Sequence, residues 1–324
     1  MIKEIKRRNA RSILLQFPEG LRGHASRISQ LVENSTDAMS MVSVDPCYGA
    51  CDLPIVQAKS LGIDLIVHFG HTPYKGREEI PVLYVETPSR METIETVRKA
   101  LPFLTGNERI GLATTIQHVA DLKKIETLLK ERGMQPIVGK KRGKIKHDGQ
   151  ILGCDYSTMQ EIDDLVDIFL LVGSMFHALG AALALRSNVV LVDPYQERIV
   201  DMREKKKTLL KRKWASISKA KRANDFGIIV GTKTGQLQLE KAIEIKKRLE
   251  SVEKRATLLI ASEVVPEDLQ YFGEFGAYVN TACPRISIDD ADRFKNPVIS
   301  VEDFEIMIGS EEWDSYVDRI YPEK

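Results

Sequence analysis

The sequence predicts an α/β protein built from three copies of one unit, each a small parallel β-sheet flanked by helices. Two observations lead to this prediction. Apolar, strand-like runs alternate with stretches of helical period, a pattern typical of parallel sheets covered by helices. One apolar run also recurs twice at an interval of 108 residues, one third of the 324-residue chain. Its copies are IPVLYVET at 80–87, NVVLVDPY at 188–195 and NPVISVED at 296–303.

The remaining elements recur in the same order in each third. An opening apolar strand is expected at 12–17, 109–114 and 226–231. A stretch of helical period follows at 24–34, 119–133 and 237–251. A further apolar strand is expected at 65–70, 168–173 and 277–282. The alternative is chance similarity inside one large α/β domain, because such domains repeat the same alternation of strands and helices.

The repeats divide the chain into a first unit at 1–105, a second at 106–198 and a third at 223–324. A basic helix is expected to connect the last two over 199–222. The segment 203–222 carries ten Lys or Arg residues and one acid, Glu204. Such a helix is either a solvated connector or a docking surface for a protein or RNA partner.

Composition narrows the class of protein. Lys and Arg total 47 and Asp and Glu 46, so no overall polyanion-binding design is expected. No apolar run reaches the ~18 residues that a membrane span needs, and the basic start lacks the apolar core of a signal peptide. Four cysteines are too few for a disulfide scaffold. We therefore expect a soluble, cytoplasmic protein with reduced thiols and no membrane partner.

The cysteines are the strongest chemical signal. Cys51, Cys154 and Cys283 supply one thiol per repeat, each on a loop that follows a strand. Loops at the carboxyl ends of parallel strands build binding sites, and three converging thiolates suit a soft metal or an iron–sulfur cluster with one open iron. Cys47 is the odd one out, and its role stays open. The alternative is four unrelated buried thiols.

The spacing excludes several common motifs. The chain has no CxxC pair, which leaves zinc ribbons and thioredoxin-like sites unsupported. Cys47 and Cys51 form a CxxxC pair, but Pro54 stands where a CxxxCxxC loop would have its third cysteine.

Several motifs together resemble the diphthamide-biosynthesis family, its archaeal members in particular. The resemblance runs from about residue 11 to residue 305, and its motifs occur in all three thirds. The motifs are LQFPEGL at 15–21, YGACD around Cys51, HFGHTPY at 68–74, ILGCD around Cys154, GSMFHALG at 173–180, GTKTGQ at 231–236 and NTACPRISIDD around Cys283.

The resemblance implies three duplicated α/β domains around a central [4Fe–4S] cluster held by Cys51, Cys154 and Cys283. It implies an S-adenosylmethionine-dependent transferase that moves the 3-amino-3-carboxypropyl group to C2 of a histidine in translation elongation factor 2. The implied reaction is radical, releases methylthioadenosine and begins diphthamide biosynthesis. A homodimer and an electron donor are also implied, with no direct contact to nucleic acid.

Other polar residues are candidates for binding the substrates. In the GTKTGQ turn, Gly231, Thr232, Thr234, Gly235 and Gln236 would offer backbone N–H groups to the methionine carboxylate of S-adenosylmethionine. An ordinary strand-to-helix turn explains the motif equally well.

The remaining candidates follow strands of the first two repeats. His71, Ser174 and His177 are expected at the same end as the cysteines, where they would bind substrate or move a proton. Pro18 and Glu19 end the first strand and would line the same cavity. Plain loop roles, and for Glu19 a helix-start acid, are the alternatives.

Two other functions remain open at this point. One is a lyase resembling quinolinate synthase, whose iron acts as a Lewis acid and needs no S-adenosylmethionine. The other is a non-catalytic, metal-binding scaffold.

Overall fold

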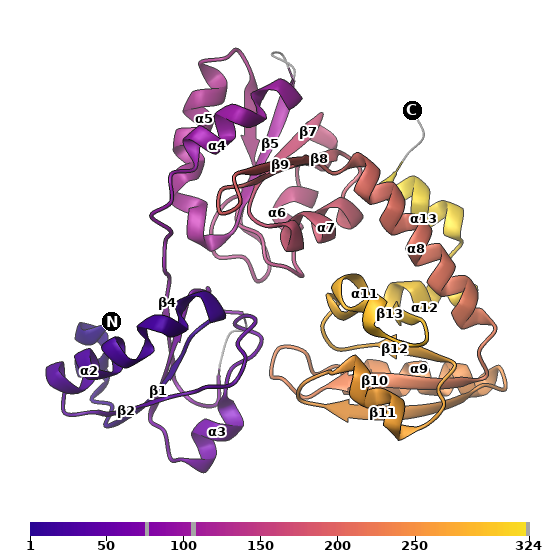
Figure 1. Cartoon of the computed structure of the whole chain (residues 1–324), viewed down its shortest axis with the longest axis horizontal. Helices are drawn as coiled ribbons and strands as arrows, with labels where there is room; N and C mark the ends of the chain where they lie inside the picture. Colours follow the sequence, from indigo (N-terminus) through magenta and orange to yellow (C-terminus); the bar gives the residue numbers. More distant parts are fainter. Residues whose placement is uncertain (75–77, 105–107, 322–324) are drawn as a thin grey trace.

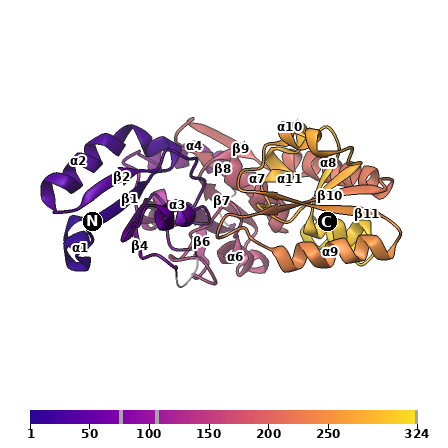
Figure 2. The same ribbon diagram turned by 90° about the horizontal axis from the view of Figure 1, so that it is seen from below.

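The protein has three lobes that follow one another along the chain and surround a common centre (Figure 1). The structure is a computed structural model and describes residues 1–74, 78–104 and 108–321. Seen from below, the first lobe lies at one end of the molecule and the third at the other (Figure 2). Each lobe is built on one β-sheet, so the chain forms a ring of three sheets.

The sheets of the described residues share one strand order. In each, the first strand lies between the second and the third, and the fourth pairs with the outer side of the third. These pairs are all parallel, and the predicted mixed α/β architecture is confirmed. The strands are β1 Ser12–Gln16, β2 Met39–Val42, β3 Leu65–Phe69 and β4 Val82–Val85; β5 Arg109–Thr114, β6 Gln135–Val138, β7 Ile168–Val172 and β8 Asn188–Asp193; β10 Asp225–Gly231, β11 Arg255–Ala261, β12 Ala277–Asn280 and β13 Val298–Ser300.

Helices cover the sheets. In the first two lobes they are α1 Ile2–Arg8, α2 Ala25–Ser35, α3 Ile55–Ser60, α4 Ile94–Ala100, α5 Leu122–Lys130, α6 Ser157–Gln160 and α7 Met175–Ala184. In the third they are α8 Arg203–Lys221, α9 Leu239–Ser251, α10 Pro266–Leu269, α11 Ile286–Asp289, α12 Val301–Met307 and α13 Trp313–Ile320. Short 3₁₀ turns lie at Glu19–His24, Leu101–Phe103, Ile116–Asp121, Asp163–Leu165, Gln270–Phe272 and Ala291–Arg293.

The 108-residue recurrence has a structural meaning. Its three copies contain β4, β8 and β13, and each of these is the strand that pairs with the third strand of its sheet. The other strands and helices predicted within the three repeats also form close to where the pattern places them. Central strands are buried on both faces, as β3 and β7 are throughout, and this burial explains their uninterrupted apolar sequence.

One anchor at the start of each third strand shows how closely the repeats correspond. The N–H of Asp64 donates to the carbonyl of Ser12, that of Asp167 to Arg109, and that of Gly276 to Asp225, at 2.9–3.0 Å. In the first two repeats the aspartate carboxylate returns a bond, accepting from the N–H of Ser12 or of Arg109 at 2.9 Å. The third repeat has a glycine there and keeps only the backbone bond.

The connector expected at 199–222 is partly a strand. Residues Arg198–Asp201 form β9, which pairs antiparallel with β8 at the edge of the second sheet. The helix α8 begins only at Arg203, because the Asp201 carboxylate accepts the N–H and the guanidinium of Arg203 at its start.

The predicted boundary at 105/106 lies outside the described residues. The helix before it, α4, packs on β8 and β9 of the second sheet, and Val97 and Ala100 belong to the second hydrophobic core. The chain thus reaches the second lobe before α4 begins. In the described part of the chain, no helix is both long and apolar enough to cross a membrane.

Candidate functional site

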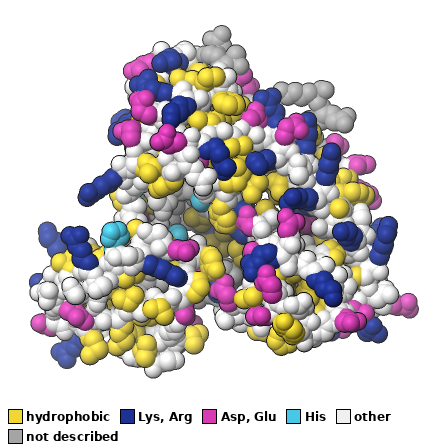
Figure 3. All heavy atoms as spheres, viewed as in Figure 1, with side chains coloured by type: hydrophobic (Ala, Val, Ile, Leu, Met, Phe, Trp, Pro, Cys, Tyr) yellow, Lys and Arg dark blue, Asp and Glu magenta, His cyan; other side chains and the backbone are white. Residues whose placement is uncertain are grey.

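The three lobes meet at a cavity of about 670 Å³ that is lined by residues of every repeat. Figure 3 shows the molecular surface hollowed where the lobes come together. Cys51, Cys154 and Cys283 all line this cavity. Cys51 follows β2, Cys154 follows β6 and Cys283 follows β12, so each thiol lies on a loop beyond the carboxyl end of a strand. The sequence prediction that one thiol per repeat reaches a common place agrees with this geometry.

The loop that carries Cys51 is held by the third repeat. The N–H of Gly235 donates to the carbonyl of Cys51 at 2.9 Å, and Gln236 Nε2 lies 3.7 Å from Cys51 Sγ. A Cβ on Gly235 would lie 2.4 Å from Cys51 Cβ, closer than two carbon atoms can approach. Glycine is therefore required at 235 for the first and third repeats to meet.

A partly buried ion-pair network braces the same contact. Lys233 Nζ donates to Asp52 Oδ2 at 2.9 Å and to Glu263 Oε2 at 2.7 Å, and it lies 4.7 Å from the centre of the Tyr48 ring. Burial would lower the pKa of Lys233, but the two carboxylates raise it above its ordinary value. The lysine stays charged and fixes the residue next to Cys51.

The other two thiols are held within their own repeats. Asn280 donates to the carbonyl of Cys283 at 2.8 Å and accepts the N–H of Ala282 at 3.1 Å. Cys154 lies in a tight turn closed by the N–H of Leu152, which donates to the carbonyl of Asp155 at 3.0 Å. Cys154 is exposed, whereas Cys51 and Cys283 are half-buried.

The electrostatics favour a metal ligand set. Burial raises the pKa of all three thiols, and for Cys154 the neighbouring Cys51 and Cys283 raise it further, to about 11. Three thiolates that line one cavity repel one another unless a cation lies between them. A soft cationic centre removes that cost, because it binds the thiolates directly.

Comparison with known proteins identifies the family. The family model described as diphthamide synthesis protein matches residues 17–317. The 2-(3-amino-3-carboxypropyl)histidine synthase of Pyrococcus horikoshii is 34% identical over 315 residues, which cover 96% of this chain and 90% of that protein. This chain belongs to the diphthamide synthesis family.

Other members agree with this assignment. Subunit 1 of the human 2-(3-amino-3-carboxypropyl)histidine synthase is 28% identical over 322 residues, covering 96% of this chain and 71% of that subunit. The crystal structure of Dph2 from Pyrococcus horikoshii with a 4Fe–4S cluster aligns with a TM-score of 0.88 at 33% identity, covering 96% of this chain and 90% of that one. The family that the sequence motifs indicated is confirmed.

In this diphthamide synthesis protein the fourth cysteine lies apart from the other three. Cys47 is 7% exposed and is not among the described residues that line the cavity. Burial raises the pKa of its thiol to about 12. Its Sγ lies within 4.8 Å of ring nitrogens of His68 and His71. Four cysteines thus divide into three at the cavity and one behind its wall.

The predicted substrate residues divide in the same way. His71, His177, Gly231 and Gln236 line the cavity. Ser174 is the residue before α7, and its hydroxyl lies 3.0 Å from His177 Nδ1, so it holds that histidine. Pro18 packs against Gly70, while Glu19 is exposed at the start of a 3₁₀ turn.

The GTKTGQ turn is a brace between repeats. Its N–H groups at Thr232, Gly235 and Gln236 donate to the carbonyls of Ala261, Cys51 and Lys233. The side chains of Thr232 and Thr234 are exposed, and neither residue is among those that line the cavity. These three N–H groups are therefore already bonded within the protein, and the carboxylate site suggested for this turn stays a prediction.

The most informative residue that the sequence reading missed is Arg285. It lines the cavity, is 6% exposed, and its guanidinium lies 4.0 Å over the Phe176 ring. Asp289 pairs with Nη2 at 2.6 Å, but Nε and Nη1 have no hydrogen-bond partner among the described residues. The sequence offered one signal, an arginine two residues after Cys283, and its significance depends on Phe176 from another repeat.

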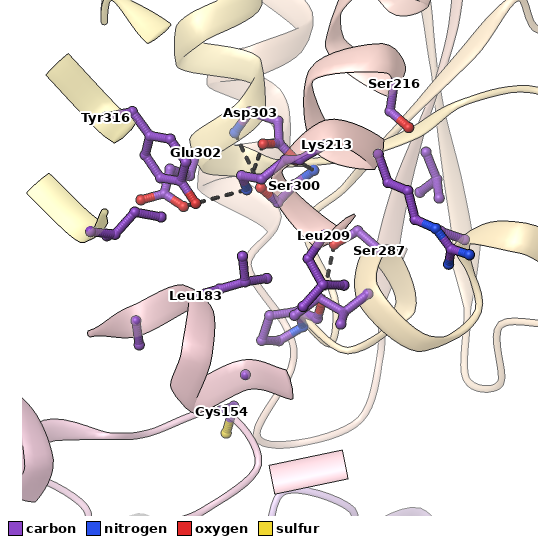
Figure 4. A pocket seen from close by; sticks show the side chains of 18 of the residues that line it. Cys154, Leu183, Leu209, Lys213, Ser216, Ser287, Ser300, Glu302, Asp303 and Tyr316 are labelled. Carbon is purple, nitrogen blue, oxygen red and sulfur yellow. Dashed lines mark hydrogen bonds and ion pairs between the residues drawn. The ribbon is translucent and has the colours of Figure 1, made fainter. Parts of the chain in front are cut away.

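A second, larger cavity of about 1050 Å³ lies between α7 and the helices of the third repeat. Figure 4 shows Lys213 extending toward Asp303 and Tyr316, with Cys154 at the opposite side. Lys213 Nζ lies 2.5 Å from Asp303 Oδ1, and Asp303 also closes a capping box with Ser300 at the start of α12. This ion pair fastens α8 to α12, and it is structural.

Proposed function

We propose that this protein transfers the 3-amino-3-carboxypropyl group of S-adenosylmethionine to C2 of a histidine in translation elongation factor 2, the first step of diphthamide biosynthesis. One observation carries the proposal: three thiols, one per repeat, line a single cavity with a buried and partly unpaired arginine. The names of the relatives support the identity of the transferred group. The cluster in the Pyrococcus horikoshii structure supports the cofactor.

The thiol set suits an iron–sulfur cluster. Cys51, Cys154 and Cys283 would hold a [4Fe–4S] cluster that, when bound, supplies one electron and an iron with an open coordination position. Cys47 lies behind the cavity wall, so the three thiols leave that position to the substrate. Because each ligand comes from a different repeat, correct packing of all three lobes is needed to bring them together.

Arg285 is the best candidate to bind the carboxylate of S-adenosylmethionine. A buried guanidinium with free N–H groups is costly unless an anion pairs with it. A carboxylate matches that fork of donors. Phe176 supports the guanidinium from one side and Asp289 from another, so its remaining N–H groups are fixed in position. Binding there would place the methionine part of the substrate next to Cys283.

The cavity also suits the rest of the substrate. About 670 Å³ lies within the range that small-molecule sites occupy. In the reaction we propose, the Cγ–S bond of S-adenosylmethionine breaks and methylthioadenosine leaves. The resulting 3-amino-3-carboxypropyl radical adds to C2 of the target histidine, and the ring would regain its aromaticity by losing the C2 proton and giving one electron back to the cluster, when bound. The protein contributes placement, because it fixes which C–S bond lies near the thiols.

Further properties of the protein remain predictions. We expect a homodimer, located in the cytoplasm, that takes its electron from a separate donor and needs no direct contact with nucleic acid.

The experiment that tests the proposal is an anaerobic product assay. The purified full chain is reduced with dithionite in the presence of S-adenosylmethionine and elongation factor 2. We expect methylthioadenosine by chromatography and, by mass spectrometry, one aminocarboxypropyl group on a histidine. Formation of 5′-deoxyadenosine as the main product would contradict the bond selectivity. Turnover of iminoaspartate with dihydroxyacetone phosphate would instead indicate a quinolinate-synthase activity.

A further inference from the structure

A chain of hydrogen bonds runs from the Cys51 loop through the buried first sheet to His71. Gln16 Nε2 donates to the carbonyl of Asp52 at 2.6 Å. Gln16 Oε1 lies 2.7 Å from His68 Nδ1, and His68 Nε2 lies 2.9 Å from His71 Nδ1. Gln16 is 2% and His68 0% exposed, so no solvent competes for these atoms. Only the last member, His71, reaches the cavity.

The chain fixes the position of every proton. The carbonyl of Asp52 can only accept, so Gln16 turns its NH₂ group to it and its oxygen to His68. His68 must therefore carry its proton on Nδ1, and its Nε2 becomes an acceptor. A neutral His71 then carries its single proton on Nδ1, the nitrogen that faces His68; this N–H also serves the hydrogen bond to the Phe69 backbone, and Nε2 keeps the lone pair.

Burial keeps the rings of His68 and His71 neutral. It lowers the pKa of His68 to about 3 and that of His71 to about 4. With neither ring protonated twice, the tautomer assignment has one solution. The nitrogen that His71 leaves available to a molecule in the cavity is Nε2, and it is an acceptor.

We propose that His71 Nε2 accepts a hydrogen bond from the imidazole N–H of the target histidine, and that Gln16 and His68 are positioning residues that hold His71 in the required tautomer. The inference rests on the proposed function and deepens it. In an imidazole, C2 lies between the two nitrogens. A hydrogen bond at one nitrogen therefore restricts how the ring turns and where C2 lies.

His177 provides the contrast within the same cavity. Its partner is the Ser174 hydroxyl, which can donate or accept, so that contact does not select a tautomer. His71 is held by a chain that ends in a carbonyl oxygen and has no such freedom. The structure thus assigns a defined acceptor to the first repeat.

A metal ion is the competing occupant of these nitrogens. Cys47 Sγ lies within 4.8 Å of both rings, and one thiol with two imidazoles is a plausible ligand set. Such an ion would take the nitrogens that now bond to each other. The hydrogen bonds of His68 to Gln16 and to His71, at 2.7 and 2.9 Å, favour the hydrogen-bonded arrangement over an ion.

The first test measures coupling in the reconstituted holoprotein. The readout is the amount of group transferred to elongation factor 2 per methylthioadenosine formed. His71→Phe should lower this ratio by about tenfold or more, because the target N–H then loses its acceptor. His71→Gln, which restores an acceptor oxygen, should recover part of the loss. His147→Gln, outside the cavity, is the matched control and should leave the ratio unchanged.

The second test needs no turnover. The full chain labelled with ¹⁵N-histidine should show His71 Nε2 as an unprotonated nitrogen by NMR, assigned by comparison with His71→Phe. Gln16→Met removes the first side chain of the hydrogen-bond series. The His71 signal should then move toward mixed tautomers, and the ratio of transferred group to methylthioadenosine should fall with it.

The possible failures are distinguishable. A wild-type protein that forms no methylthioadenosine would overturn the proposed function, and this inference with it. If the wild type transfers the group, an unchanged ratio in His71→Phe would overturn this inference alone. So would a protonated Nε2, or a zinc ion that disappears from the full chain in Cys47→Ala.

Discussion

The first two repeats and the third carry their cysteines at different places on the same fold. Cys51 and Cys154 follow the second strands β2 and β6, whereas Cys283 follows the third strand β12. In the third repeat, the loop after β11 carries Glu263, which binds Lys233. After β3 the loop carries His71, and after β7 the first turn of α7 carries His177, in both cases instead of a thiol. All these loops lie at the carboxyl ends of parallel strands, so any of them can reach the centre.

This difference teaches that the three repeats share a scaffold but not the position of the chemistry. A loop is free to change because strand pairing holds the sheet without it. The third repeat has also lost the carboxylate anchor of the other two, with Gly276 at the position of Asp64 and Asp167. The three repeats share the same strand order but carry their functional side chains on different loops.

The largest effect, loss of bound iron, is expected when the cysteines are replaced. These variants show whether Cys283, which follows a different strand, is equivalent to the other two. Cys51→Ser, Cys154→Ser and Cys283→Ser should each lose bound iron, by more than the ~10–100-fold that removal of an outer partner costs. Cys47→Ala should retain it. Iron content and the visible absorption of anaerobic protein provide the measurement. Full iron in Cys283→Ser would show that the third repeat contributes no ligand.

The next effect concerns the arginine that only the third repeat supplies. Arg285→Met should raise the KM for S-adenosylmethionine by about 10–100-fold, since a charge-assisted hydrogen bond is lost. Arg285→Lys should recover only part of this, because an ammonium does not reproduce the planar fork. Initial rates of methylthioadenosine formation give the values. An unaltered KM in both variants would assign the carboxylate to another residue.

A smaller effect is expected where the third repeat touches the first. Gly235→Ala places a methyl group 2.4 Å from Cys51 Cβ and should destabilise the protein by about 1–3 kcal/mol. Iron content should fall with it, because the Cys51 loop has to move. Gly20→Ala, where a Cβ meets no atom within 4 Å, is the control. Thermal unfolding compares the two, and equal midpoints would contradict a tight contact.

The smallest effect concerns the carboxylate anchor of the first two repeats. Hydrogen bonds from the backbone N–H groups of Ser12 and Arg11 lower the pKa of Asp64 below its ordinary value. A lowered folded-state pKa adds stability above the ordinary pKa, and that stability is lost as the pH falls through the folded-state value.

Asp64→Asn should therefore lower the thermal midpoint at neutral pH, with the difference from wild type vanishing in acid. The exposed Asp268→Asn should show no such pattern. Thermal unfolding across the acid range measures both, and a midpoint difference that persists in strong acid would count against the anchor.

The sequence by itself determined the three repeats, their strands and the three cysteines of the cavity. These features are written in local patterns, because a buried strand or an amphipathic helix shows its period within a short window. The start of α8 was misplaced, since residues 198–201 pair with β8 and no local period reveals such a partner.

Only the tertiary structure decided what the side chains do. Gln16, Asp52 and His68 are far apart in the chain, yet they hold His71 in one tautomer. Arg285 acquires its meaning from Phe176 of another repeat, and the GTKTGQ turn proved to be a brace because Cys51 takes its N–H. The physical reason is the same in each case: hydrogen bonds and close contacts join residues whose separation along the chain carries no pattern.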